Sequence, residues 1–242
     1  KKMKVRSFIA GILCILLFPC VGHAAPIVES KAGINTECVQ ATLTDENGNK
    51  IEIPVEISDI KRDLNVEPVA MSDIDGTNES YYQEFSTLID PETVQEAVTR
   101  VGGTYGDIAY DASMTLKLWG KVYFDKNASN QYLVTRMEGH FKNLQPERLD
   151  LINRNVVVAC TNNFNEATAQ HKTWRNAPSG FNYYTGFKYY ADATRPFAAV
   201  GGSMSCQGRT SDGHTWDVFL SLPLGGSNVL PGLDEEHPKP QV

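Results

Sequence analysis

Aromatic residues are concentrated in one stretch of the chain, from Trp174 to Tyr190. Flat rings match the apolar faces of pyranose sugars, and a phenol can add a hydrogen bond, so a set of such side chains on one sheet face suits glycan binding. Core packing is the alternative, because strand alternation sends Tyr183 and Tyr184 to opposite faces and at least one of those faces must be inside. We predict a ligand-binding aromatic face. Its predicted members are Trp119, Tyr123, Trp174, Tyr184 and Tyr190.

Residues that could catalyse a reaction do not form a recognisable motif. A glycosidase needs a carboxylate pair, for which the candidates are Asp107, Asp111, Glu138 and Asp217. Ser203 and Ser211 lack a nucleophile-elbow sequence. The histidines after residue 24 have no spacing typical of a metal-binding pair; they are His140, His171, His214 and His237. The sequence therefore predicts no metal and no cofactor, and it favours a non-enzymatic protein while leaving a hydrolase open.

Charged and apolar residues at the N-terminus predict a secretory signal peptide over residues 1–24. Basic residues precede an apolar run from Phe8 to Val21, and the small residues Gly22 and Ala24 suit cleavage after Ala24. The apolar run of 14 residues is shorter than the ~20 needed to cross a bilayer. We therefore expect a secreted, extracellular protein with no membrane insertion after cleavage.

The cysteines bear on the same prediction, because disulfides persist outside the cytoplasm. Cleavage after Ala24 leaves Cys38, Cys160 and Cys206. We predict a disulfide between Cys160 and Cys206, since both end apolar segments of one domain. The two other pairings, each of which includes Cys38, stay open.

The acidic composition argues against two classes of partner. The net charge of the chain is -7, and it becomes -11 without residues 1–24, which hold four basic residues and no acidic one. Nucleic acids and anionic membranes require an extended basic surface, which such a chain is poorly suited to assemble. Solubility is the simplest role of the acidity. A glycan or another cell-surface ligand remains possible, and the sequence does not determine the oligomeric state.

Period-two alternation dominates the chain and predicts a mainly β fold. Residues 25–58 form an N-terminal β-hairpin segment in which Asn47-Gly48 turns the chain and Pro54 favours an edge strand or a bulge. Residues 59–80 are expected to be a linker or long loop, and residues 225–242 a disordered tail. Residues 81–224 are the predicted β-rich main domain.

The main domain is predicted to be an antiparallel β-sandwich or barrel-like structure with one short packing helix. Asp90 and Pro91 start the helix, and Gly102-Gly103 ends it. Residues 112–142 form a long hairpin, with Gly120 as a possible bulge. In its first strand, one face is expected to hold Met114, Leu116, Leu118, Val122 and Phe124, and the other Thr115, Lys117, Trp119, Lys121 and Tyr123. In its second strand Leu133, Met137 and Phe141 are expected on one face and Tyr132, Val134, Arg136 and Glu138 on the other. Further predicted strands are 149–160, 181–190, 197–207 and 215–222.

The segment Tyr183-Tyr184-Thr185-Gly186-Phe187-Lys188-Tyr189-Tyr190, together with Val156–Cys160 and Gly201-Gly202-Ser203, resembles small exported proteins of Gram-positive bacteria with uncharacterised function. The resemblance covers residues 110–222. It implies a secreted β fold and nothing about activity, so no functional residue is transferred.

These observations favour a secreted, non-enzymatic binding or cell-surface contact protein whose ligand is unknown and could be a glycan. An extracellular hydrolase acting on polysaccharide is one alternative. An antibacterial exoprotein is another, because small β-rich toxins also lack catalytic motifs.

Overall fold

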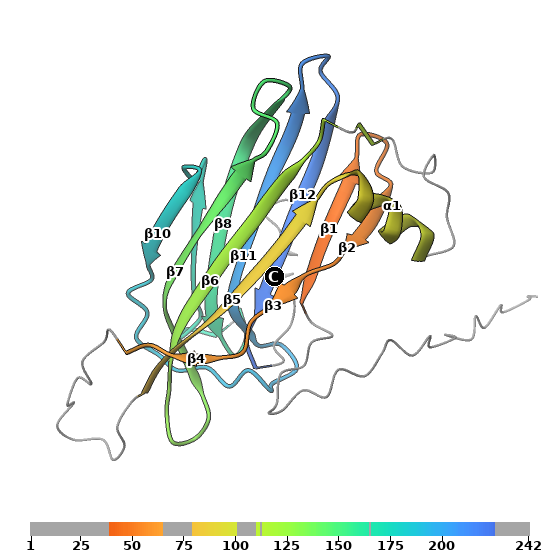
Figure 1. Ribbon diagram of the computed structural model, residues 1–242. Coiled ribbons are helices and arrows are strands. Elements are labelled where there is room, and N and C mark those ends of the chain that lie inside the picture. The colour runs from red at the N-terminus through yellow and green to blue at the C-terminus, as the bar shows by residue number, and fades with distance from the viewer. Residues whose placement is uncertain (1–38, 65–78, 101–109, 112, 165, 226–242) are drawn as a thin grey trace, which may run out of the picture. The chain divides into compact units, whose positions relative to one another are not determined.

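The computed structural model describes residues 39–64, 79–100, 110–111, 113–164 and 166–225, which all belong to one compact unit (Figure 1). The predicted signal peptide, Cys38 and most of the predicted tail lie outside these residues. Within the described part of the chain, no helix is both long and apolar enough to span a membrane.

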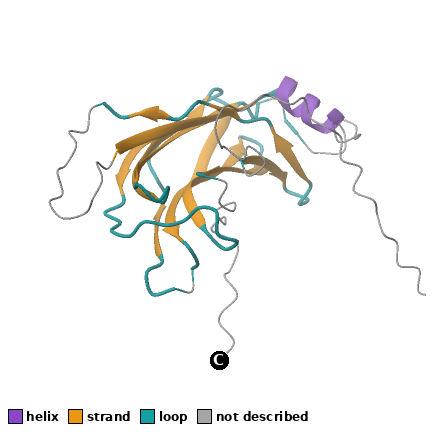
Figure 2. Cartoon of the chain, turned by 90° about the horizontal axis from the view of Figure 1, so that it is seen from below, coloured by secondary structure: helices purple, strands orange, loops and turns teal. Residues whose placement is uncertain are grey.

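Two antiparallel sheets account for most of the described chain. Sheet A has the strand order β2-β1-β12-β11-β8-β9, and sheet B has the order β10-β7-β6-β5-β3, with β4 also paired to β5. Figure 2 shows the sheets as two layers. The strands are β1 (Gln40–Asp45), β2 (Lys50–Ile53), β3 (Glu56–Ile57), β4 (Lys61–Arg62), β5 (Glu79–Ile89), β6 (Leu116–Lys126), β7 (Tyr132–Asn143), β8 (Leu149–Thr161), β9 (Gln170–Arg175), β10 (Gly180–Tyr184), β11 (Ala199–Thr210) and β12 (Thr215–Pro223). The predicted antiparallel sandwich with one short helix is confirmed.

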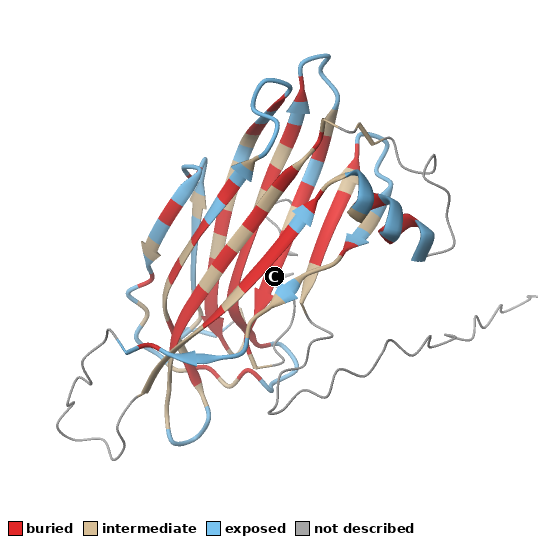
Figure 3. Cartoon of the chain, viewed as in Figure 1, coloured by how far each residue is buried: buried red, intermediate tan, exposed pale blue. Residues whose placement is uncertain are grey.

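The core lies between the two sheets and is built by alternation along their strands. Leu118 and Val122 of β6 are fully buried, as are Leu220 and Leu222 of β12. Figure 3 shows the alternation as bands of buried residues along the long strands. Gly120 allows the sheets to approach closely, because a Cβ there would lie 2.7 Å from the Leu222 side chain. Gly120 is therefore a packing residue.

The N-terminal hairpin is an integral part of the sandwich. β1 pairs with β2 through a turn in which Gly48 has a φ of 83°, and β1 also pairs with β12. Pro54 follows β2, which is one of the two edge strands of sheet A, and the chain then crosses to sheet B. The crossing is fixed by two buried side chains of β5: Thr87 donates to the Pro54 carbonyl at 2.8 Å, and Gln83 donates to the Ser58 carbonyl at 3.0 Å.

The single described helix, α1 (Pro91–Arg100), forms where its end signals predict it. The Asp90 carboxylate caps it by accepting a hydrogen bond from the Thr93 amide at 2.8 Å. Val94, Ala97 and Val98 form the buried face. The helix is thus a packing element, as expected, and Gly102-Gly103 lie outside the described residues.

The long hairpin follows the predicted alternation in β6 but only in part of β7. A register shift in the β6–β7 pairing leaves Thr135 unpaired, so that Val134 and Arg136 lie on opposite faces. Val134 is fully buried, whereas Leu133, which was expected to face the core, is partly exposed. The predicted facing of residues before the bulge is therefore wrong. Gly120 is not bulged, since it pairs in register with both neighbouring strands.

The predicted disulfide between Cys160 and Cys206 is also wrong. Both cysteines are buried and free. Cys160 pairs with Val200 on β11, six residues before Cys206, and six residues of strand span about 20 Å. A disulfide requires Cα atoms within about 7 Å. The two thiols therefore act as separate core side chains in neighbouring strands.

Candidate functional site

The outward side of sheet B carries an ordered array of aromatic and charged side chains. The register of β5, β6, β7 and β10 aligns these residues in rows that run across the strands. The tyrosine row contains Tyr82, Tyr123, Arg136 and Tyr184. The glutamate row contains Glu84, Lys121, Glu138 and Asn182. The tryptophan row contains Ser86, Trp119, His140 and Gly180.

Two cations lie against the rings of the tyrosine row, Arg136 from the row itself and Lys121 from the glutamate row. The Arg136 guanidinium lies 3.6 Å from the centroid of the Tyr123 ring and 5.6 Å from that of Tyr184. Lys121, from the next row, lies 3.8 Å from the Tyr82 centroid and 4.9 Å from that of Tyr123. Tyr123 is 7% exposed, whereas Tyr184 is 69% exposed. Cation–π attraction thus fixes the inner rings, and the Tyr184 ring stays accessible to a ligand.

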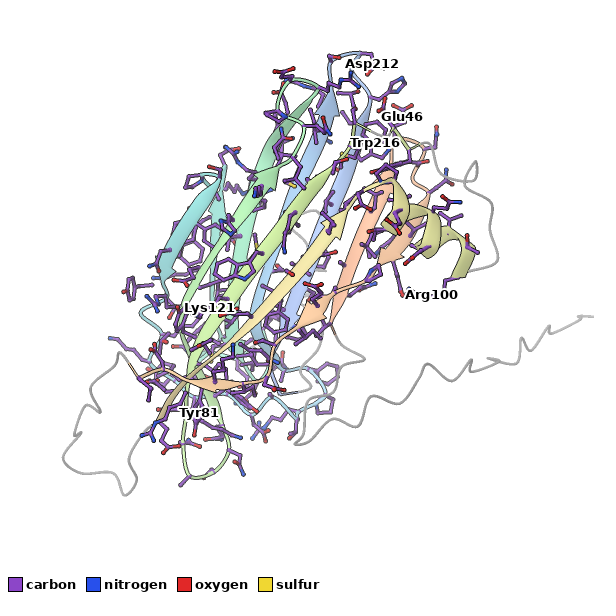
Figure 4. All side chains as sticks on the ribbon, in the orientation of Figure 1. Glu46, Tyr81, Arg100, Lys121, Asp212 and Trp216 are labelled. Atoms are coloured by element: carbon purple, nitrogen blue, oxygen red, sulfur yellow. The ribbon has the colours of Figure 1, made fainter. Side chains whose placement is uncertain are left out.

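The glutamate row balances these cations. The Lys121 ammonium lies 3.6 Å from Glu84 and 3.8 Å from Glu138, and Tyr123 donates a hydrogen bond to Glu138 at 2.8 Å. Burial lowers the pKa of Lys121, but Tyr123, Glu138 and Glu84 outweigh it, so the pKa is raised overall. Lys121 therefore stays positively charged across the physiological pH range. Figure 4 shows Lys121 among the side chains of this face.

The tryptophan row extends the aromatic surface along the strands. Trp119 is partly exposed, and its ring centroid lies 5.0 Å from that of the exposed His140 on β7. On β5, Ser86 donates to Glu56 at 2.9 Å, which closes the row on that side. The outer face of sheet B therefore offers an indole and the Tyr184 phenol about four residues apart along the strands, which corresponds to roughly 13 Å.

The structure brings together three of the five predicted aromatic residues. Trp119, Tyr123 and Tyr184 share the outer face of sheet B, whereas Trp174 lies on β9 of sheet A and packs against the core. Its ring stacks on that of Tyr183 with centroids 4.5 Å apart and an angle of 2°. Tyr190 lies outside the strands and is partly buried.

Sequence reasoning missed the partners that organise this face. Tyr82 and Glu84 lie on β5, a strand that the sequence did not predict, and Arg136 and Lys121 were not considered as members of a site. For Lys121 and Arg136, the available signal was their alternation with buried apolar residues such as Val122 and Met137. Only the pairing of β5, β6 and β7 places them in contact.

Two of the candidate carboxylates for hydrolysis, Glu138 and Asp217, lie on opposite faces of the sandwich. Glu138 faces outward from sheet B, and Asp217 of β12 is exposed on the outward side of sheet A, where it accepts a hydrogen bond from Gln207 at 3.0 Å. The core separates these two faces, so Glu138 and Asp217 cannot flank one glycosidic bond. Asp107 lies outside the described residues, whose His, Cys, Asp and Glu side chains form no metal-binding group.

A second cluster joins two turns at the other end of the strands from Tyr81, as the labelled residues in Figure 4 show. The His214 Nδ1 lies 3.1 Å from Glu46, and Nε2 lies 3.9 Å from Asp212. The hydrogen bond to Glu46 and the charges of both carboxylates raise the pKa of His214. This cluster links the β1–β2 turn to the β11–β12 turn.

Comparison with known proteins gives no relative. No family model matches the chain, and neither a curated protein nor a solved structure is significantly similar to it. The function is therefore argued from the geometry alone.

Proposed function

We propose that the protein is a secreted, non-enzymatic binding protein that contacts an extracellular glycan through the outer face of sheet B. One observation carries the proposal: strands β6, β7 and β10 present Trp119, Arg136 and Tyr184 on a single solvent-facing side. Aromatic rings kept on the outside of a sheet are costly in water and gain contact area when a sugar ring stacks on them. Carboxylates and cations beside them can bind sugar hydroxyls.

The fixed geometry of the array also supports binding. Lys121 and Arg136 each contact rings and carboxylates, so several side chains of this face are held before any ligand arrives. Pre-ordered side chains lose less conformational entropy on binding, which raises affinity. Secretion and extracellular localisation belong to the same proposal and derive from the N-terminal sequence.

Binding of the full chain to an array of cell-wall, plant and host glycans tests the proposal. We expect Tyr184→Ala and Trp119→Ala each to weaken binding about tenfold, equivalent to ~1.4 kcal/mol. Phe197→Ala is the matched control, because Phe197 is 71% exposed but lies outside sheet B. Absence of any bound glycan, or equal losses in all three variants, would contradict the proposal.

The two alternatives rest on fewer observations. An extracellular hydrolase would need a carboxylate pair other than Glu138 and Asp217. An antibacterial exoprotein would inhibit the growth of related bacteria without binding glycans through Tyr184, and a growth assay with the purified protein separates that role from glycan binding. The resemblance to exported Gram-positive proteins also remains a prediction.

A further inference from the structure

Two lysines face each other at the end of the sheet B face next to Trp119. Lys117 of β6 and Lys142 of β7 are directly opposite in the strand pairing. Opposed residues of an antiparallel pair have Cβ atoms about 5 Å apart, and like charges at that spacing are destabilising. Within the described residues, neither lysine has a carboxylate within 4.0 Å, whereas Lys121 on the same face has two.

Apolar and aromatic side chains border this lysine pair. Trp119 and His140 are the next outward residues on the same two strands, about 7 Å along. Leu88 of β5 pairs with Lys117 and is 39% exposed. The end of the face therefore combines uncompensated positive charge with an indole ring and an exposed aliphatic side chain.

We propose that this end of the face binds a uronate of an acidic polysaccharide, with the carboxylate between Lys117 and Lys142 and the sugar ring on Trp119. The inference rests on the proposed glycan-binding function and names its ligand class. A uronate presents an apolar ring face and an anionic group a few ångströms apart, which matches the spacing of the indole and the lysine pair. The carboxylate would also relieve the repulsion between the two ammonium groups.

The net negative charge of the chain does not prevent this contact. Charges separated by more than about 8 Å are largely screened at physiological ionic strength. The lysine pair therefore dominates the electrostatic energy of a ligand that touches it, and distant carboxylates contribute little to that energy. Binding through this pair should weaken as salt is added, because the attraction between exposed charges is screened.

The test compares two polymers that share one backbone: polygalacturonate and its fully methyl-esterified form, which is neutral. We expect the full chain to bind polygalacturonate at least about tenfold more tightly than the ester, and this preference to fall as NaCl is raised from about 50 to about 500 mM. The double variant Lys117→Gln/Lys142→Gln should lose the preference. Its melting temperature should stay the same or rise by about 1–3 °C, because repulsion is removed.

Lys50→Gln/Lys172→Gln is the matched control. It changes the net charge equally at two exposed lysines of sheet A. Equal loss in this control, or an unchanged preference in the Lys117→Gln/Lys142→Gln variant, would overturn the uronate site. Binding to dextran sulfate but not to polygalacturonate would overturn the carboxylate assignment. If neutral glycans bind through Tyr184 and Trp119 but uronates gain nothing, the proposed function stands and this inference fails; if no glycan binds, both fail.

Discussion

Replacing Arg136 tests whether the tyrosine row is held together as the structure indicates. The guanidinium packs on the Tyr123 ring at 3.6 Å and lies 3.9 Å from Asp63 and 4.0 Å from Glu138. The side chains of Arg136 and Asp63 are 21% and 5% exposed, so the contact is only partly screened by water. Arg136→Met keeps much of the aliphatic stem and removes the charged plane.

The expected loss follows from these contacts. A partly desolvated cation–π contact contributes about 1 kcal/mol. Loss of the ion pairs, one of them to the mostly buried Asp63, costs about another 1 kcal/mol. Arg136→Met should therefore lower the free energy of unfolding by about 2 kcal/mol, which for a domain of this size lowers the melting temperature by about 4–8 °C. Arg136→Lys keeps the charge but not the planar group, so about half of that loss is expected.

Urea unfolding of the two variants and of Tyr123→Leu provides the measurement. A double-mutant cycle between Arg136→Met and Tyr123→Leu should give a coupling free energy of about 1 kcal/mol. A coupling below about 0.3 kcal/mol, or a loss in Arg136→Met below about 0.5 kcal/mol, would refute the view that the guanidinium is fixed on the ring.

Three further predictions address the core, the turn cluster and the thiols. Gly201→Ala should lower the free energy of unfolding by about 3 kcal/mol, because the φ of Gly201 is 135° and a Cβ there would lie 2.2 Å from a backbone carbonyl oxygen of β12. Gly180→Ala is the control: no atom lies within 4 Å of the added Cβ, so stability should change little. NMR titration should give His214 a pKa above 6.5. The contribution of His214 to stability is then complete below the unfolded pKa of about 6.5 and is lost as the pH rises through the higher pKa of the folded state. A folded-state pKa at or below 6.5 would disprove the pairing of His214 with Glu46. Burial raises the pKa of Cys160 to about 11 and that of Cys206 to about 12. In a background where Cys14, Cys20 and Cys38 are replaced by serine, neither thiol should therefore react with a thiol reagent at pH 8 until the protein unfolds. Rapid labelling of the folded protein would contradict their burial.

Much of the fold could be predicted because the relevant signals are local. Asp90 and Pro91 mark the start of α1, and alternation places Trp119 and Tyr123 on the outward side of β6. Strand β5 was not predicted because two of its inward-facing residues, Gln83 and Thr87, are polar, so the sequence shows no regular alternation of apolar and polar residues there. These two residues are tolerated there because they donate hydrogen bonds to carbonyls of the crossing segment, a partnership that no local pattern reveals.

The candidate site shows the same division between local and long-range information. The sequence alone determined which residues of β6 face outward, because side chains alternate along any extended strand. Only the tertiary structure decided that Tyr82, Arg136 and Tyr184 join them, since strand order and register depend on pairings between distant segments. It also separated Cys160 from Cys206 and placed Trp174 on the other sheet, because both outcomes depend on strand register and sheet order rather than on local sequence.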